Sequence, residues 1–396
     1  MEIEMKYILI IADGMADQKL QELGNQTPLQ YAKTEAIDAL AKRSEIGFVQ
    51  TIPDGMEAGS DVAGLSIFGY EPQVYYTGRA PLEALGLQIP LEPQDIVYRC
   101  NLVTLSSERE YEKRRMIDHM GGEISTVHAK EIIKNLQNVF DRTAYQYYTE
   151  TSYRHLLVWK HGKIEGLTPP HNILGEQIGN YLPEEEALLS MMKKSDQWLH
   201  EQPTGTANSI WFWGGGKRTN LPDFSQKYGK RGAMISAVAV MKGIAAGANL
   251  TNITVQGATG TVDTNYGEKA QRALKALIEE QYDFICIHIE APDEASHRGD
   301  ANGKIKAIEQ IDQKIVKVLV KELDALKINA RILILPDHET LVKTRKHTNA
   351  KVPYLLYDSR DRLEKNQAYN EEQGCFKQKL LSGTELIERL FSENKK

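Results

Sequence analysis

The chain has 396 residues, 41% hydrophobic and 26% charged, which is typical of a soluble globular enzyme with enough sequence for a well-buried core. Its 48 basic and 54 acidic side chains give a formal charge of −6, so no global positive field indicates nucleic-acid binding, and an anionic ligand would need locally gathered cations. Three widely separated cysteines exclude a disulfide scaffold and a thiolate zinc knuckle, and they fit a reducing cytosol: Cys100, Cys286 and Cys375.

The first predicted element is a strand over residues 7–11, a continuous apolar and β-branched run typical of a strand covered on both faces. This run is too short to span a membrane and lacks a signal-peptide cleavage pattern, so we expect a cytoplasmic protein without a membrane partner. Thr27-Pro28 then predicts a helix through about Arg43, with Thr as the N-cap and Pro at the first helical position.

The middle of the chain, residues 86–229, has shorter elements and is rich in Tyr, Arg, His and Trp. Strands are predicted there at 153–159 and 209–213. After it, the pattern of residues 230–246 predicts a strongly amphipathic helix.

The last part of the chain alternates strands and helices. Buried strands are predicted at 283–289, 330–335 and 352–357, and a terminal helix from about Thr384. A long helix is predicted between the first two strands, from about 302 to 326, with one apolar face formed by Ile308, Ile311, Ile315 and Leu319. Strand, helix and strand at this spacing form a parallel crossover unit. We therefore expect an α/β protein with a doubly wound, mostly parallel sheet in residues 1–85 and 230–396, interrupted by an inserted smaller α+β domain in 86–229.

Three predicted strands of the sheet are each followed by an acidic residue: Asp13, Asp293 and Asp337. Ligands of open α/β sheets collect beyond the carboxyl ends of the strands. Any one of these aspartates taken alone is more often a helix cap than a ligand. Three at equivalent strand ends, two of them accompanied by histidine, indicate a binding site.

The accompanying histidines give these aspartates a metal-ligand pattern. Asp293 and His297 are four residues apart and project from one face if the stretch is helical, whereas Asp337 and His338 are adjacent and could serve two ions. His347 follows nine residues after His338. Mixed carboxylate and imidazole ligands suit Mn²⁺ or Zn²⁺ better than Ca²⁺ or Mg²⁺, which take all-oxygen cages. For any one histidine alone, a core or surface role remains the simpler interpretation.

Ser60 follows a loop rich in Pro and Gly and opens a predicted helix over 62–68. Unpaired backbone N–H groups and the positive end of a helix dipole favour both an alkoxide and a bound phosphate there. A coordinating divalent ion would lower the hydroxyl pKa further, so the serine could act as a nucleophile without a histidine base. By itself, Ser60 has the simpler interpretation of a helix N-cap.

The order of short motifs resembles cofactor-independent phosphoglycerate mutases, most closely the short archaeal-type branch within the alkaline phosphatase superfamily. The resemblance covers nearly the whole chain, and together its motifs are highly specific. They are Asp13-Gly14-Met15, Gly59-Ser60-Asp61-Val62-Ala63, Gly69-Tyr70, Tyr76-Thr77-Gly78-Arg79, Arg99-Cys100-Asn101-Leu102-Val103, Met234-Ile235-Ser236-Ala237, Pro292-Asp293-Glu294-Ala295-Ser296-His297, Asp337-His338 and His347-Thr348.

This resemblance implies interconversion of 3-phosphoglycerate and 2-phosphoglycerate in glycolysis and gluconeogenesis, through a phosphoserine on Ser60 and without 2,3-bisphosphoglycerate. It also implies a phosphatase-like core and a smaller domain that closes over the substrate. Two divalent ions are implied, Mn²⁺ or Zn²⁺ foremost, with Mg²⁺ and Co²⁺ as further candidates. One ion would be held by Asp13, Ser60, Asp337 and His338, and the other by Asp293, His297 and His347.

A phosphorylated substrate with a carboxylate also needs cationic partners, and Arg holds a carboxylate best because it can bind it in bidentate fashion. Arg154 and His155 begin a predicted strand and should face opposite ways, so we expect at most one of them to point inward. For each basic residue a solvated surface charge remains the alternative. The candidates are Arg79, Arg99, Arg154, His155, His171 and Lys242.

The chain departs from the family pattern at Glu339-Thr340, directly after Asp337-His338, where small residues are common.

Three other functions remain open at this point. A homoserine kinase-like phosphotransferase would keep the metal chemistry and need a nucleotide, a plain phosphatase would release phosphate steadily, and a non-catalytic binding protein would bind no divalent metal. The expected partner is a small phosphorylated substrate, phosphoglycerate, and a homo-oligomer is neither required nor excluded.

Overall fold

The computed structural model describes residues 5–201, 205–361, 363–372 and 380–392. The chain divides into two compact units, which we call the core unit, Met1–Tyr76 with Asn220–Lys396, and the inserted unit, Thr77–Thr219. The insert was expected at 86–229, so it begins and ends earlier than its pattern suggested. Helix α5 (Arg79–Gly86) packs on the strands of the inserted unit, whereas Phe224 of α8 (Phe224–Tyr228) stacks on Phe284 of the core sheet.

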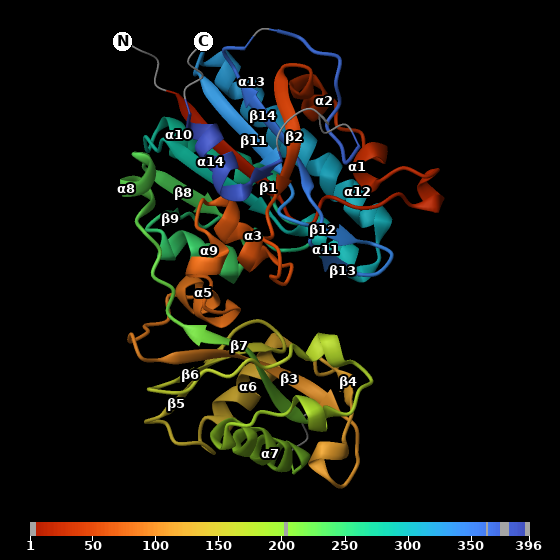
Figure 1. Ribbon diagram of the computed structural model, residues 1–396, viewed down its shortest axis with the longest axis vertical. Helices are drawn as coiled ribbons and strands as arrows, with labels where there is room; N and C mark the ends of the chain where they lie inside the picture. The colour runs from red at the N-terminus through yellow and green to blue at the C-terminus, as the bar shows by residue number, and fades with distance from the viewer. Residues whose placement is uncertain (1–4, 202–204, 362, 373–379, 393–396) are drawn as a thin grey trace. The chain divides into compact units, whose positions relative to one another are not determined.

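The core unit is built on an eight-stranded sheet in the order β15-β2-β14-β11-β1-β10-β8-β9 (Figure 1). All its pairings are parallel except those of β14 with β11 and with β2, which confirms the predicted mostly parallel sheet. Its strands are β1 (Lys6–Ala12), β2 (Ser44–Gln50), β8 (Gly232–Ile235), β9 (Thr251–Asn252), β10 (Phe284–Ile289), β11 (Ala330–Leu335), β14 (Val352–Asp358) and β15 (Leu381–Ser382). A separate hairpin joins β12 (Glu339–Leu341) and β13 (Lys346–Thr348).

Helices cover both faces of this sheet, because its central strands are apolar on both sides. One face packs against α2 (Glu35–Ala41), α10 (Tyr266–Ile278) and a continuous helical segment of α12 (Ala301–Gln310), the π-helix η5 (Ile311–Val316) and α13 (Lys317–Ala325). The other carries α3 (Ser60–Ile67), α9 (Ala239–Gly247) and α14 (Gly383–Phe391). The shorter elements are η1 (Gln21–Leu23), α1 (Pro28–Tyr31), α4 (Pro72–Tyr75), α8 (Phe224–Tyr228) and α11 (Ala291–Arg298).

Two predicted helices differ from the structure. Thr27 does cap a helix that begins with Pro28, but the chain leaves the helix at Ala32 and restarts at Glu35, so the single helix expected through Arg43 is wrong. The helix expected over 230–246 is also wrong in its first part, where Gly232–Ile235 pairs with β10 as a strand. A short apolar run fits the periodicity of a helix and that of a strand, and for Gly232–Ile235 the pairing with β10 determines the strand.

The inserted unit contains an antiparallel sheet in the order β4-β3-β6-β5, with β7 also paired to β3. Both predicted strands are present, as β6 and β7. The strands are β3 (Ile96–Leu105), β4 (Met116–Asp118), β5 (Tyr145–Thr149), β6 (Arg154–Trp159) and β7 (Ser209–Lys217). The helices are α5 (Arg79–Gly86), η2 (Tyr111–Lys113), α6 (Thr126–Leu136), η3 (Pro170–Ile173), η4 (Ile178–Tyr181) and α7 (Glu186–His200). This unit has its own apolar core, which includes Trp211, Phe212 and Leu188.

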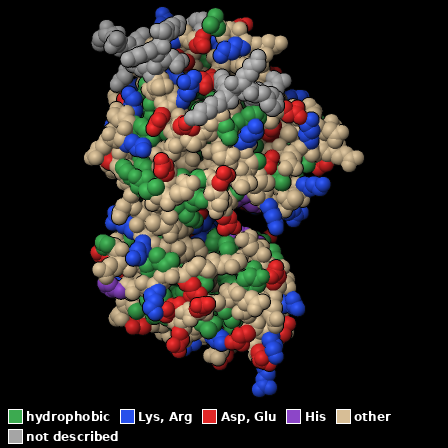
Figure 2. Space-filling view, viewed as in Figure 1, with side chains coloured by type: hydrophobic (Ala, Val, Ile, Leu, Met, Phe, Trp, Pro, Cys, Tyr) green, Lys and Arg blue, Asp and Glu red, His purple; other side chains and the backbone are tan. Residues whose placement is uncertain are grey.

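Three expectations from the composition can be compared with the structure: mixed surface charge, helices too short or too polar to cross a membrane, and cysteines that are not paired. Acidic and basic side chains lie interspersed over the face drawn in Figure 2. Among the described residues, no helix combines the length and the apolar character that crossing a membrane requires. Cys100 and Cys286 are buried free thiols, whereas Cys375 lies outside the described residues.

Candidate metal centre and nucleophile

The carboxyl ends of three adjacent strands bring the predicted acidic residues to one edge of the core sheet. Strand β1 lies between β10 and β11, and Ala12 pairs with Ile289 while Ile11 pairs with Leu335. The residues that follow these strand ends therefore share one edge. Asp13 and Asp337 are fully buried there, and α11 supplies Asp293 in its first turn.

Ser60 and three predicted ligands form the first set. The Ser60 Oγ atom lies 3.1 Å from Asp13 Oδ2 and 3.3 Å from His338 Nε2. His338 Nε2 also lies 3.6 Å from Asp13 Oδ1 and 3.4 Å from Asp337 Oδ2. All four side chains are buried, Ser60 being 8% exposed. The structure thus gathers the residues expected to hold one ion.

The protons in the first set can be assigned from its hydrogen bonds. Thr340 Oγ1 donates to Asp293 Oδ1 over 2.7 Å and lies 3.1 Å from His338 Nδ1. Its single proton is used on the carboxylate, so Nδ1 of His338 must donate to the threonine. The Nε2 atom then carries a lone pair. Burial lowers the pKa of His338 to about 4, which keeps this imidazole neutral.

That lone pair faces two carboxylate oxygens that lack a donor. Asp13 Oδ1 and Asp337 Oδ2 are buried without a hydrogen-bond partner, while Asp337 Oδ1 accepts from the N–H groups of Gly14 and His338. Three electron-rich atoms that face one another in a buried site are unfavourable unless a proton or a cation lies between them. A cation would satisfy all three, so the residues present fit a metal ion.

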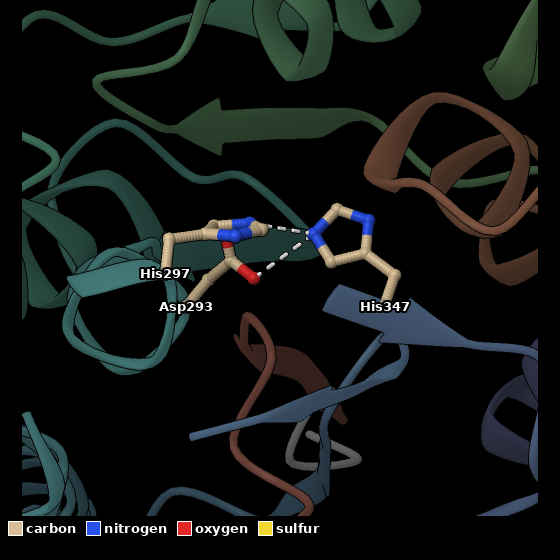
Figure 3. Close-up of side chains that lie close together, drawn as sticks. All are labelled: Asp293, His297 and His347. Carbon is tan, nitrogen blue, oxygen red and sulfur yellow. Dashed lines mark hydrogen bonds and ion pairs between the residues drawn. The ribbon is translucent and has the colours of Figure 1, made fainter. Parts of the chain in front are cut away.

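Asp293, His297 and His347 form the second set (Figure 3). The two Nε2 atoms are 2.8 Å apart, and each lies 3.2 Å from an oxygen of Asp293. The outer Nδ1 atoms lie against backbone carbonyls, that of His297 at 2.9 Å from Arg345 O and that of His347 at 3.2 Å from Ala58 O. This is the usual arrangement of metal-binding histidines, because an acceptor behind Nδ1 directs Nε2 to the ion.

The charges of the two sets also indicate a cation. Burial, and then repulsion from Asp337 and Asp293, raise the pKa of Asp13 well above its ordinary value. Burial opposes ionisation of Asp293, but hydrogen bonds from His297 and His347 hold its pKa well below the ordinary value. The same carboxylate raises the pKa of His297 to about 9 against the effect of burial. The pair of imidazoles thus binds a proton more readily than an ordinary histidine does, and a metal ion would supply positive charge at the same place.

Sequence reasoning missed His288 and Glu290, which form a further potential ligand group with Asp13. The His288 Nε2 atom is 2.9 Å from Asp13 Oδ2, and its Nδ1 atom is 3.1 Å from Ser236 Oγ. Burial lowers the pKa of His288 to about 4. The available signal was a histidine inside the apolar strand β10, where a buried polar group needs a partner.

Three of the predicted basic residues lie together in the inserted unit. Arg79 Nε and Arg99 Nη1 donate to the same oxygen of Glu83, over 2.9 and 2.8 Å. Arg154 and Glu150 interact electrostatically with Arg99. Three guanidinium groups and two carboxylates leave one positive charge in excess. Such a cluster could hold an anion, and Glu83 and Glu150 were not anticipated from the sequence.

The remaining basic candidates lie in different surroundings. As expected of neighbours in a strand, Arg154 is half-buried while His155 is fully buried. Burial lowers the pKa of His155 to about 3. His171 is exposed and packs against the rings of His119 and Trp213. Lys242 belongs to α9 of the core unit.

Comparison with known proteins places this geometry in a family. The sequence profile of the 2,3-bisphosphoglycerate-independent phosphoglycerate mutases matches residues 41–205. A probable 2,3-bisphosphoglycerate-independent phosphoglycerate mutase of Geobacter sulfurreducens is 43% identical over 89% of this chain and 90% of its own length. A relative of the same name from Methanosarcina acetivorans is 41% identical, with the same coverage of both chains.

Solved structures agree with the sequence relatives. A protein of Pyrococcus horikoshii superposes with a TM-score of 0.79 at 26% identity and covers 99% of both chains. The cofactor-independent phosphoglycerate mutase of Thermoplasma acidophilum has a TM-score of 0.63 at 21% identity, over 98% of this chain and 100% of that one, and so shares the fold. From the sequence relatives, the chain belongs to the 2,3-bisphosphoglycerate-independent phosphoglycerate mutases.

Proposed function

We propose that this chain interconverts 3-phosphoglycerate and 2-phosphoglycerate through a phosphoserine formed on Ser60. The observation that carries the proposal is the position of one buried hydroxyl within 3.3 Å of two groups from the first ligand set, Asp13 and His338. The relatives described above carry the mutase name, which supports the mutase and not the homoserine kinase. A mutase of this family acts on a small phosphorylated substrate.

The ligand assignment follows the two clusters of the core unit. One divalent ion would be held by Asp13, Ser60, Asp337 and His338, and the other by Asp293, His297 and His347. Mixed oxygen and imidazole ligands favour Mn²⁺ or Zn²⁺. When bound, such ions lower the pKa of a coordinated hydroxyl and offset negative charge on a transferring phosphoryl group.

The chain's own residues then carry the two transfers. In the first transfer the Ser60 hydroxyl gives up its proton and its oxygen forms a bond to phosphorus, the bond from phosphorus to the substrate oxygen breaks, and the departing alkoxide takes up a proton. In the second transfer the neighbouring hydroxyl of the enclosed glycerate gives up its proton and attacks the phosphoserine, the bond from Ser60 to phosphorus breaks, and the Ser60 oxygen takes up a proton. Asp13 accepts the hydrogen bond of the Ser60 hydroxyl, and that hydrogen bond orients the nucleophile between transfers.

The inserted unit is proposed to hold the substrate carboxylate and to exclude water. Its excess positive charge at Arg79, Arg99 and Arg154 suits a carboxylate, which Arg binds in bidentate fashion. His171 and Lys242 are further proposed contacts. Water has to be excluded because it would compete with glycerate for the phosphoserine and turn the mutase into a phosphatase.

A cytoplasmic location remains a prediction from the sequence.

The test is turnover of 3-phosphoglycerate with Mn²⁺, followed by appearance of 2-phosphoglycerate and of free phosphate. We expect conversion without 2,3-bisphosphoglycerate or nucleotide, little release of phosphate, and loss of activity with a chelator. Ser60→Ala should lower the rate by a factor on the order of 10³ or more, because the nucleophile itself is removed. Ser66→Ala changes a buried serine of the same helix and should leave the rate unchanged. Activity that persists in Ser60→Ala would falsify the covalent route.

A further inference from the structure

The side chain of Thr340 is hydrogen-bonded to both ligand sets, to His338 of the first and to Asp293 of the second. We infer that the Thr340 hydroxyl is a positioning group that ties the two sets together, so that the binding of each ion depends on it. This inference rests on the proposed function, because it concerns the ions of that site. It goes further by assigning a role to a residue beyond the seven proposed ligands.

The direction of the two hydrogen bonds is fixed by chemistry. Thr340 Oγ1 donates its one proton to the carboxylate oxygen Asp293 Oδ1 over 2.7 Å. The hydroxyl oxygen is then the acceptor for His338 Nδ1 at 3.1 Å. One bond orients a ligand of the second set, and the other selects the tautomer in which His338 presents Nε2 to the first set.

The neighbouring glycine leaves room for this contact. Gly14 has a φ of +60°, and a Cβ atom placed on it would lie 2.5 Å from Thr340 Oγ1 and 2.7 Å from Asp293 Oδ1. Any side chain at position 14 would therefore displace the hydroxyl, the carboxylate or both. The same glycine donates its N–H to Asp337 Oδ1 over 3.0 Å, so one residue supports the first set and leaves space for the link.

The backbone of Thr340 is held firmly as well. Its N–H donates to Ala16 O over 3.1 Å, and its carbonyl accepts from the fully buried Lys304 Nζ over 2.8 Å. Lys304 also donates to Asp17 Oδ2 and Ala16 O. Within the β12–β13 hairpin, Thr340 is paired with His347, a ligand of the second set. Contacts of its backbone with Ala16, Lys304 and His347 thus hold Thr340 and position its hydroxyl.

The first test is the protonation of His338 in the metal-free protein. Histidines labelled with ¹⁵N report the tautomer, and the His338 signal is identified by its loss in His338→Gln. We expect the proton on Nδ1 in the wild type and in Thr340→Ser, which keeps the hydroxyl. In Thr340→Val, which keeps the shape, the proton should move to Nε2, where carboxylate oxygens can accept it. A wild-type His338 protonated on Nε2 would overturn the inference without any variant.

The second test is a titration with Zn²⁺, a diamagnetic ion, followed through the same histidine signals. His338 reports the first set, and His297 and His347 report the second. Thr340→Val should weaken Zn²⁺ binding at both sets by about 10- to 100-fold, as loss of an outer-shell partner typically does. Thr340→Ser should stay near the wild type. Thr104→Val, which removes a hydrogen-bonded hydroxyl in the inserted unit, should bind as the wild type does.

Other outcomes have distinct meanings. Weakening at only one set, or at neither, would overturn the linking role of Thr340. A wild type that binds no Zn²⁺, or that binds it but does not convert 3-phosphoglycerate, would count against the proposed function instead. The tautomer measured in the metal-free wild type stays a test of Thr340 in either case, because it requires neither bound ion nor turnover.

Discussion

Asp13 is a buried carboxylate whose usefulness depends on a cation. It is fully buried, lies near Asp337 and Asp293, and has one oxygen without a donor. In the metal-free protein its ionisation is therefore costly. With a cation present, the same carboxylate is a strong ligand. Asp13 therefore lowers the stability of the metal-free protein but is needed for metal binding.

Replacing Asp13 by Asn should separate these demands. We expect Asp13→Asn to stabilise the metal-free protein by about 1–2 kcal/mol at neutral pH, because folding no longer has to protonate this carboxylate or bury its charge. Binding of Mn²⁺ at the first set and mutase activity should both fall sharply. Thermal unfolding with and without Mn²⁺ checks this, and a metal-free variant less stable than the wild type would contradict it.

Glu371 provides a test by pH away from the ligands. Burial raises its pKa from 4.5 to about 7, against the effect of a hydrogen bond from Thr27. A carboxyl with a raised folded-state pKa favours the protonated protein, so its contribution to stability is lost as pH rises from about 4.5 to about 7. Glu371→Gln should therefore be more stable than the wild type by about 1–3 kcal/mol at pH 8 and nearly equal at pH 4. Unfolding in urea at both pH values measures this, and a difference that does not change with pH would rule out the titration.

Among the elements, the π-helical turn η5 has a defined task. Its Asp312 side chain is almost fully buried and accepts hydrogen bonds from the backbone N–H groups of Ile37 at 2.7 Å and Ala36 at 3.3 Å. These are the first-turn donors of α2, whose own N-cap residue, Thr34, makes no side-chain capping bond. A residue of one helix therefore caps another, and the widened turn brings it there.

Loss of this cap should destabilise the core unit. Asp312→Ala leaves two donors without their partner and should cost about 1–2 kcal/mol, while Asp312→Asn keeps an acceptor and should cost less. Denaturant unfolding of the two variants gives the comparison. Equal losses in both would show that charge, and not the hydrogen bond, is what matters.

The elements also show how far the sequence could be interpreted by itself. Strands β1, β10 and β11 were predictable because they are continuous apolar runs, and the acidic residues after them were predictable as a site because parallel strands end at one edge. The strand β8 was not, since Gly232–Ile235 gains its strand conformation only by pairing with β10. Likewise, the contacts of Thr340 with Asp293 and of Arg99 with Glu83 depend on tertiary packing that no local pattern encodes.

Over the whole molecule, both ligand sets belong to the core unit. A ligand that binds only the folded state stabilises the part that binds it, by about 2.7 kcal/mol at a concentration 100 times the dissociation constant. In calorimetry we expect Mn²⁺ to raise the melting temperature of the core unit by several degrees. Chelator should reverse this effect, and the transition of the inserted unit should move little. Equal shifts of all transitions, or none, would contradict this expectation.

The inserted unit begins and ends at nearly the same point, since the hydroxyls of Thr77 and Thr219 are 2.9 Å apart. A segment whose two ends already touch can be gained, lost or exchanged in one genetic event without cutting a strand of the catalytic sheet. The ancestry of the two units need not be shared. Chimaeras that carry a foreign insert between these two threonines would test whether the insert decides which substrate the core unit converts.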